Sequence, residues 1–239
     1  MTSIAAPAWL DPADARVEDL RAHVERGTDP AAHPRAAAIR SGVPVYDAAA
    51  LLADDRRAVQ TELVATLLDG AGIVVIAGAF ERTVLDAATT EFRAMIAEQR
   101  ASGAVAGDHF AKPGANDRIW NAAEKLALRA PDVFAAYYAN PALALVCEAW
   151  LGPGYQVTSQ INQVNPGGAA QSPHRDYHLG FMDAAGAARY PAHVHRLSPA
   201  LTLQGAVAHG DMPVESGPDR KSTRLNSSHS GESRMPSSA

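Results

Sequence analysis

The sequence predicts an α+β fold in which helices come first along the chain and strands follow. Up to about residue 152 the apolar residues recur at helical spacing. Beyond it, short apolar or alternating runs are separated by turns rich in Pro and Gly, a pattern typical of strands. We therefore expect the strands to form a sheet or barrel that is faced by the N-terminal helices.

Four helices are predicted in the first part of the chain. A short amphipathic helix is expected within residues 14–27 and a long one within 46–72, which ends at Gly70 and Gly72. Two more are expected over 82–100 and over 140–152, the latter with Pro141 in its first turn. The apolar stripe of the second helix contains Leu51, Leu52, Val59, Leu63, Leu67 and Leu68, and that of the third contains Val84, Leu85, Ala88, Phe92 and Met95.

Three strands are predicted. Residues 72–80, GIVVIAGAF, form a short β-branched run between glycines and suit a buried strand. Residues 155–164, YQVTSQINQV, alternate with polar side chains on both faces, and residues 201–209, LTLQGAVAH, form a further apolar strand.

The composition fits one globular core. The chain has 239 residues, of which 47% are hydrophobic and 20% are charged. We divide it into a loose N-terminal arm (1–45), a main domain (46–218) and a polar tail (219–239). The tail resembles the translation of a sequencing adapter, first as DRKSTRLNSSH and again as SRMPSSA, so we expect it to be disordered and give His229 no role.

Several classes of function are excluded by charge and hydropathy. The formal net charge of −5, without a basic cluster before the tail, argues against nucleic acid as a partner. No apolar run is long enough to span a bilayer, and the N-terminus lacks the pattern of a secretory signal. The single cysteine, Cys147, lies in an apolar run and is expected to be a buried, inert thiol. We expect a cytoplasmic protein with a small-molecule partner; the oligomeric state is not predicted.

The stretch QSPHRDYHLGF, residues 171–181, contains a possible metal site. In an extended chain His174 and Asp176 point to the same side, whereas Arg175 points away. An imidazole and a carboxylate are two of the three ligands in the facial triad of non-heme Fe(II) centres. The motif alone is weak, because the chain holds a second copy, His209-Gly210-Asp211. The alternative is that these are ordinary polar residues at the end of a strand.

The context of the motif resembles a known family. The segment INQVNPGGAAQSPHRDYHLGF (161–181), followed by LTLQGAVAHGDMPVESGP (201–218), is similar to the phytanoyl-CoA dioxygenases, which are Fe(II)- and 2-oxoglutarate-dependent oxygenases. The resemblance covers about residues 46–218. It implies N-terminal helices packed on a double-stranded β-helix (a jelly-roll or cupin-like fold), incomplete in this chain, with His174 and Asp176 as iron ligands. It also implies that His209 is structural, at the end of a core strand.

The resemblance and the chemistry of nearby residues suggest further site residues. In the family, the second iron histidine and the arginine that binds 2-oxoglutarate follow the SGP turn. In this chain adapter-like sequence follows that turn, so neither role is assigned to a residue. We therefore expect the chain as given to be an inactive fragment. No catalytic residue beyond the metal ligands is predicted. Candidates for binding the co-substrate are Asn162, Gln160, Lys112 and Arg118, and candidates for lining the substrate pocket are His178, Trp120 and Phe181.

These candidates have simpler interpretations. Asn162 can be an ordinary polar sheet residue, Lys112 and Arg118 can be solvated loop residues, and the aromatic side chains can be part of the core.

The predicted function is a dioxygenase that uses Fe(II), 2-oxoglutarate and O2 to hydroxylate an unactivated C–H bond; Asp176 favours hydroxylation over halogenation. The alternative is a non-catalytic small-molecule binding or interaction protein on the same scaffold. A zinc hydrolase is disfavoured, because no H-E-x-x-H motif is present.

Overall fold

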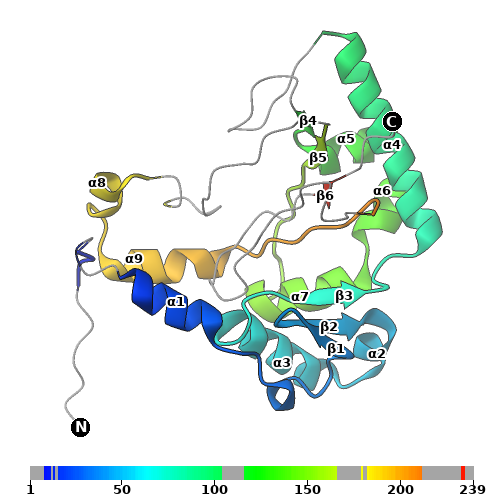
Figure 1. Ribbon diagram of the computed structural model, residues 1–239. Helices are drawn as coiled ribbons and strands as arrows, with labels where there is room; N and C mark the ends of the chain where they lie inside the picture. Colours follow the sequence, from blue (N-terminus) through cyan, green and yellow to red (C-terminus); the bar gives the residue numbers. More distant parts are fainter. Residues whose placement is uncertain are drawn as a thin grey trace.

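Two small three-stranded sheets with helices packed around them make up the part of the chain that the computed structural model describes, residues 8–11, 13, 16–103, 116–165, 179, 182–211 and 233–234 (Figure 1). The α+β class is thereby confirmed. The elements are α1 (Val17–Glu25), η2 (Pro30–Ala32), β1 (Ala38–Arg40), β2 (Val43–Asp47), α2 (Ala48–Ala53), α3 (Arg56–Leu68), β3 (Val75–Ala77), α4 (Arg82–Ala101), β4 (Asn116–Ile119), α5 (Ala122–Arg129), α6 (Pro131–Tyr138), α7 (Pro141–Leu151), β5 (Ile161–Val164), α8 (Ala184–Ala187), α9 (Ala192–Leu197), η3 (Ser198–Leu201) and β6 (Ser233–Arg234).

The first sheet has the order β1-β2-β3, with β2 antiparallel to β1 and parallel to β3. β2 begins at Val43, so the predicted boundary at residue 45 falls inside this strand. The strand predicted within residues 72–80 is confirmed as β3. It is an edge strand, however, and Val75 is exposed, so the expectation of full burial was wrong. α3 and α7 pack against this sheet around a core of Tyr46, Leu51, Val59, Leu63, Leu67, Leu145 and Val146.

The long helix predicted within residues 46–72 is two helices. Tyr46 belongs to β2, and the side chain of Asp47 caps α2 by accepting a hydrogen bond from the amide of Ala50 at 2.9 Å. Asp55 caps α3 in the same way, with the amide of Ala58 at 2.7 Å. Because aspartate favours the position before a helix over its interior, each cap starts a new helix.

The second core lies between α4, α5, α6 and the β4–β5 pair, and Figure 1 shows α4 running past all of them. α4 confirms the helix predicted over 82–100, and its stripe is buried at Ala88, Phe92 and Met95. α7 confirms the helix over 140–152, with Pro141 in the first turn and Gly152 as the C-cap. Cys147 is buried within α7, as expected.

Two strand predictions need correction. Only residues 161–164 of the stretch 155–164 form a strand, β5. Residues 201–209 form none, because their backbone pairs with no described strand; side chains hold the segment instead, with Leu203 packing on the first core and Val207 on the second. In the tail, Ser233–Arg234 form β6 parallel to β5, which was not expected; the open edge of a short strand can pair with almost any backbone.

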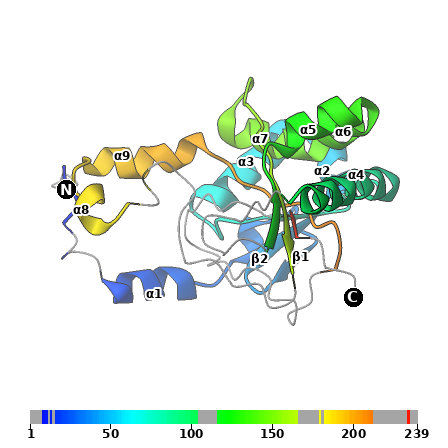
Figure 2. The ribbon, with the colours of Figure 1, turned by 90° about the horizontal axis from the view of Figure 1, so that it is seen from above.

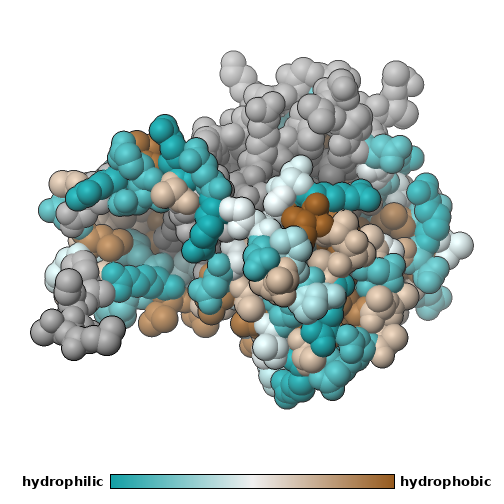
Figure 3. Space-filling model, turned by 60° about the horizontal axis from the view of Figure 1, so that its bottom comes forward, coloured by the Kyte–Doolittle hydropathy of each residue, from teal (hydrophilic) through white to brown (hydrophobic). Residues whose placement is uncertain are grey.

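The remaining helices lie to one side of the two sheets (Figure 2). α1 confirms the short helix predicted within 14–27. Trp9 forms an isolated bridge with Pro191, and the amide of Ala192 donates to the carbonyl of Ala8 at 2.8 Å, so the N-terminal segment lies against α9. On the face shown in Figure 3, hydrophobic residues are scattered over a largely hydrophilic surface. No helix within the described ranges is long and apolar enough to cross a membrane.

Two of the three leucines of α3, Leu63 and Leu68, make a matched test of this packing. Leu63 is fully buried, whereas Leu68 is 51% exposed. We expect Leu63→Ala to lower the free energy of unfolding by about 2–5 kcal/mol, because it leaves a cavity in the first core. Leu68→Ala should change it by no more than about 0.5 kcal/mol. Urea unfolding of both variants checks this, and equal losses would contradict the orientation of α3.

Candidate functional site

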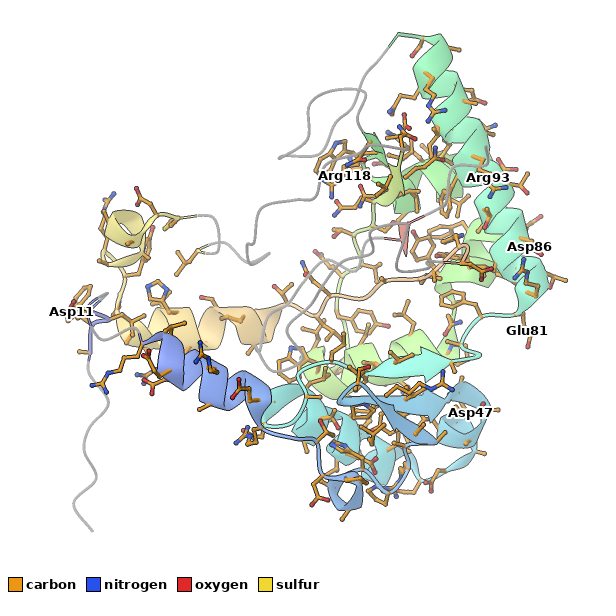
Figure 4. The ribbon with its side chains drawn as sticks, viewed as in Figure 1. Asp11, Asp47, Glu81, Asp86, Arg93 and Arg118 are labelled. Carbon is orange, nitrogen blue, oxygen red and sulfur yellow. The ribbon has the colours of Figure 1, made fainter. Side chains whose placement is uncertain are left out.

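The β4–β5 pair has two different faces. The strands are antiparallel, with Arg118 opposite Asn162 and Asp117 opposite Gln163. Ile119 and Ile161, also opposite one another, belong to the core packed on α4. Because side chains alternate along a strand, Asp117 shares the α4 side with Ile119, and Arg118 points to the other side. Figure 4 shows Arg118 on the side of β4 away from α4.

The face away from α4 is polar and buried. Arg118 is 3% exposed and Asn162 is 4% exposed. The guanidinium carbon of Arg118 lies 4.2 Å from the centroid of the Trp120 ring, a cation–π contact. The Nδ2 atom of Asn162 has no hydrogen-bond partner in the described part of the chain. A buried amide without a partner costs free energy, so this donor is suited to a bound acceptor.

The structure brings together three of the predicted site residues. Arg118, Trp120 and Asn162 meet on this face, and the half-buried Gln160 precedes β5. The placement of Arg118 in a solvated loop was wrong, since β4 is a strand and all four of its residues are buried. Residues 108–120 contain a glycine and were therefore predicted to be a loop, so the short strand near the end of this segment was missed.

The other five candidate residues lie in two parts of the sequence: one comes shortly before β4, and four lie on either side of Leu179. Lys112, His174, Asp176, His178 and Phe181 fall outside the described residues, and their roles stay predictions. Leu179 is 3% exposed. Leu179, three positions after Asp176 in the sequence, is thus a buried residue.

The second histidine–aspartate motif does not form a metal site. His209 is buried, and both of its ring nitrogens are engaged: Nδ1 lies 2.7 Å from Thr89 Oγ1 and Nε2 lies 2.8 Å from the Tyr137 hydroxyl. The Thr89 hydroxyl donates to the carbonyl of Leu85 at 2.6 Å, so it accepts from Nδ1–H. Tyr137 then donates to Nε2. This directed chain of hydrogen bonds assigns His209 as neutral and structural.

Burial keeps His209 uncharged. Desolvation, with a smaller contribution from the positive charge of Arg93, lowers the pKa of His209 to about 4. Tyr137 stacks on the imidazole at 5.5 Å between ring centroids, and burial raises the pKa of its hydroxyl well above the usual range. Within the described ranges no three His, Cys, Asp or Glu side chains are grouped so as to hold a metal ion.

A comparison with known protein families confirms the family resemblance. The model of the phytanoyl-CoA dioxygenase (PhyH) family matches residues 68–220, more than half of the chain. The match includes both segments on which the resemblance rests, 161–181 and 201–218, and with them His174 and Asp176. Searches of curated proteins and of solved structures found no match.

The hydrogen-bonded His209 predicts how stability depends on pH. Its pKa is about 4 in the folded protein, whereas an unperturbed histidine has a pKa of 6.5. Between these values the unfolded chain binds a proton that the folded protein does not, so stability is full above pH 6.5 and falls as the pH drops towards 4. The loss attributable to His209 should reach about 3 kcal/mol.

His209→Gln removes this titration. Urea unfolding of wild type and variant at pH 7 and at pH 4.5 measures the contribution of the His209 titration to stability. The change in carboxylate ionisation between these pH values is common to both proteins and therefore cancels in the comparison. We expect the difference in stability between wild type and variant to shrink at the lower pH. A difference that stays constant would contradict the buried, neutral state of His209.

Proposed function

Because the chain belongs to the phytanoyl-CoA dioxygenase family, we propose that its site is that of an Fe(II)- and 2-oxoglutarate-dependent dioxygenase whose reaction hydroxylates an unactivated C–H bond of a small molecule. Members of this family are oxygenases of the Fe(II)- and 2-oxoglutarate-dependent class. The observation that carries the proposal is the buried polar face formed by Arg118 and Asn162, two residues of the region that the family model matches.

His174 and Asp176 are the proposed protein ligands of the iron. A neutral imidazole and a carboxylate are the donor set that a facial Fe(II) site uses, and such a site leaves positions open for co-substrate and O2. When bound, iron with 2-oxoglutarate and O2 supplies the oxidising chemistry, while the protein positions the substrate and shields the reaction. His178 and Phe181 are proposed on the substrate side of this centre, and Asp176 favours hydroxylation over halogenation.

Arg118 and Asn162 are proposed to bind the co-substrate. 2-Oxoglutarate is a dianion with carboxylate and carbonyl acceptors, so it matches a guanidinium and an unpaired amide N–H on one face. Burial strengthens these contacts, because water does not compete there. Gln160 and Lys112 are proposed as further donors, and Trp120 holds the guanidinium of Arg118 in place through their stacking. The double-stranded β-helix is the fold proposed to complete the pocket.

The metal pair is tested by two substitutions and a matched histidine control. His174→Ala and Asp176→Ala should each weaken Fe(II) binding at least about tenfold, since the loss of an iron ligand costs at least as much as the loss of its hydrogen-bond partner. His193→Ala, which removes an exposed histidine of α9, should leave the affinity unchanged. Anaerobic calorimetric titration measures all three, and equal affinities would refute the assignment.

The co-substrate site is tested separately by Asn162→Leu. This change keeps the volume but removes the unpaired donor, so it should weaken 2-oxoglutarate binding about tenfold or more while Fe(II) affinity stays the same. Gln156→Leu, at an exposed position of the same segment, is the control. The charge-transfer absorption of the Fe(II) protein during 2-oxoglutarate titration reports binding. Unchanged 2-oxoglutarate affinity in Asn162→Leu would exclude Asn162 from the site.

A further inference from the structure

A surface groove lies between the last turns of α4 and α5, on the side of the molecule away from α1 (Figure 2). Its volume is about 550 Å³. Met95 of α4 and Ile119 of β4 line its base, and both side chains also belong to the second core. The groove is therefore an opening in the surface through which apolar side chains of the core can be reached.

An apolar side chain stands on the α5 wall of the groove. Leu128 lines the groove and is 81% exposed. α5 packs on the second core through Leu126, which is fully buried, so Leu128 takes no part in core packing. A single exposed leucine is ordinary on a protein surface. Here, however, the leucine protrudes beside a hollow with an apolar base, so one surface carries both an apolar projection and a site that can receive it.

The two walls of the groove carry opposite charges. Lys125 on α5 is exposed and forms no ion pair within the described part of the chain. Glu98 on α4 has a side chain that is 63% exposed, and it accepts one hydrogen bond from Arg129 Nη1 at 2.8 Å. A carboxylate can accept from more than one donor, so Glu98 has capacity for a second cation. The surface is thus complementary to itself in charge as well as in shape.

We propose that this groove is the contact surface between two copies of the chain. Leu128 of each copy inserts into the groove of the other, and Lys125 of each copy lies against Glu98 of the other. A two-fold axis makes both contacts equivalent, because the same surface then gives and receives the leucine. The presence of projection, hollow, cation and anion on one surface favours a second copy over an unrelated partner. The proposal does not depend on the proposed function.

The leucine is tested by sedimentation equilibrium of the full chain at about 1–100 μM, where we expect wild type to form a dimer. Leu128→Glu should raise the dissociation constant at least about 100-fold, because it places a charge in an apolar groove twice in every dimer. Leu201→Glu is the matched control, since Leu201 is 82% exposed but lies in η3, which contributes no residue to the groove. It should leave the dissociation constant unchanged.

The charged pair is tested by reversal. Lys125→Glu and Glu98→Lys should each raise the dissociation constant about tenfold, because each places like charges opposite one another. The double variant, Lys125→Glu with Glu98→Lys, should bring association back to nearly the wild-type level. Thermal melting of every variant confirms that it is folded; Leu128→Glu should melt at the wild-type temperature, since this side chain is exposed in the single chain.

Three results would overturn the proposal. Wild type that stays monomeric over the whole concentration range has no such interface. A dimer that survives Leu128→Glu, or that Leu201→Glu dissociates, is formed by another surface. Single charge variants that weaken association without recovery in the double variant would refute the contact between Lys125 and Glu98, and with it the proposed two-fold arrangement.

Discussion

The register of β4 against β5 decides on which side of the sheet each polar group of the candidate site lies. With Arg118 opposite Asn162, both side chains are buried away from α4, and Asn162 Nδ2 has no hydrogen-bond partner among the described residues. A shift of one residue would exchange the two faces and bring Asp117 in place of Arg118. The face would then carry a negative charge, which would repel an anionic co-substrate.

α4 fixes that register through two kinds of contact. Near its middle, Phe92 packs in the second core and Thr89 binds His209, which brings the segment of residues 202–211 against the same helix. At its end, Arg100 binds Asp117 on the strand face opposite to Arg118. One helix therefore supports the site from behind, while the polar residues proposed to touch the co-substrate face the other way.

The helices of this fold can be predicted from local sequence, but the pairing of its strands cannot. The helical stripe of α4 and the Pro and Gly at the ends of α7 each determine their helix without distant partners. In contrast, residues 201–209 have the composition of a strand but no described strand to pair with, and β4 is too short for a periodic pattern. The pairing of Arg118 with Asn162 depends on residues more than forty positions apart, so the sequence suggested both as candidates without placing them together. The proposed metal ligands, His174 and Asp176, were suggested by motif and family resemblance, whereas the hydrogen bonds of Asp117 with Arg100 and Asn165 gave no recognisable signal in the sequence.

The position of a bound metal tests the account most directly. Crystals of the protein loaded with Mn(II) in place of Fe(II), together with 2-oxoglutarate, would locate the ion by anomalous scattering. The account predicts one strong peak between the imidazole of His174 and the carboxylate of Asp176, on the side of β4–β5 that carries Arg118 and Asn162, with 2-oxoglutarate in contact with both of these side chains. A peak at His209 and Asp211, or a metal bound on the α4 side of the strands, would contradict it.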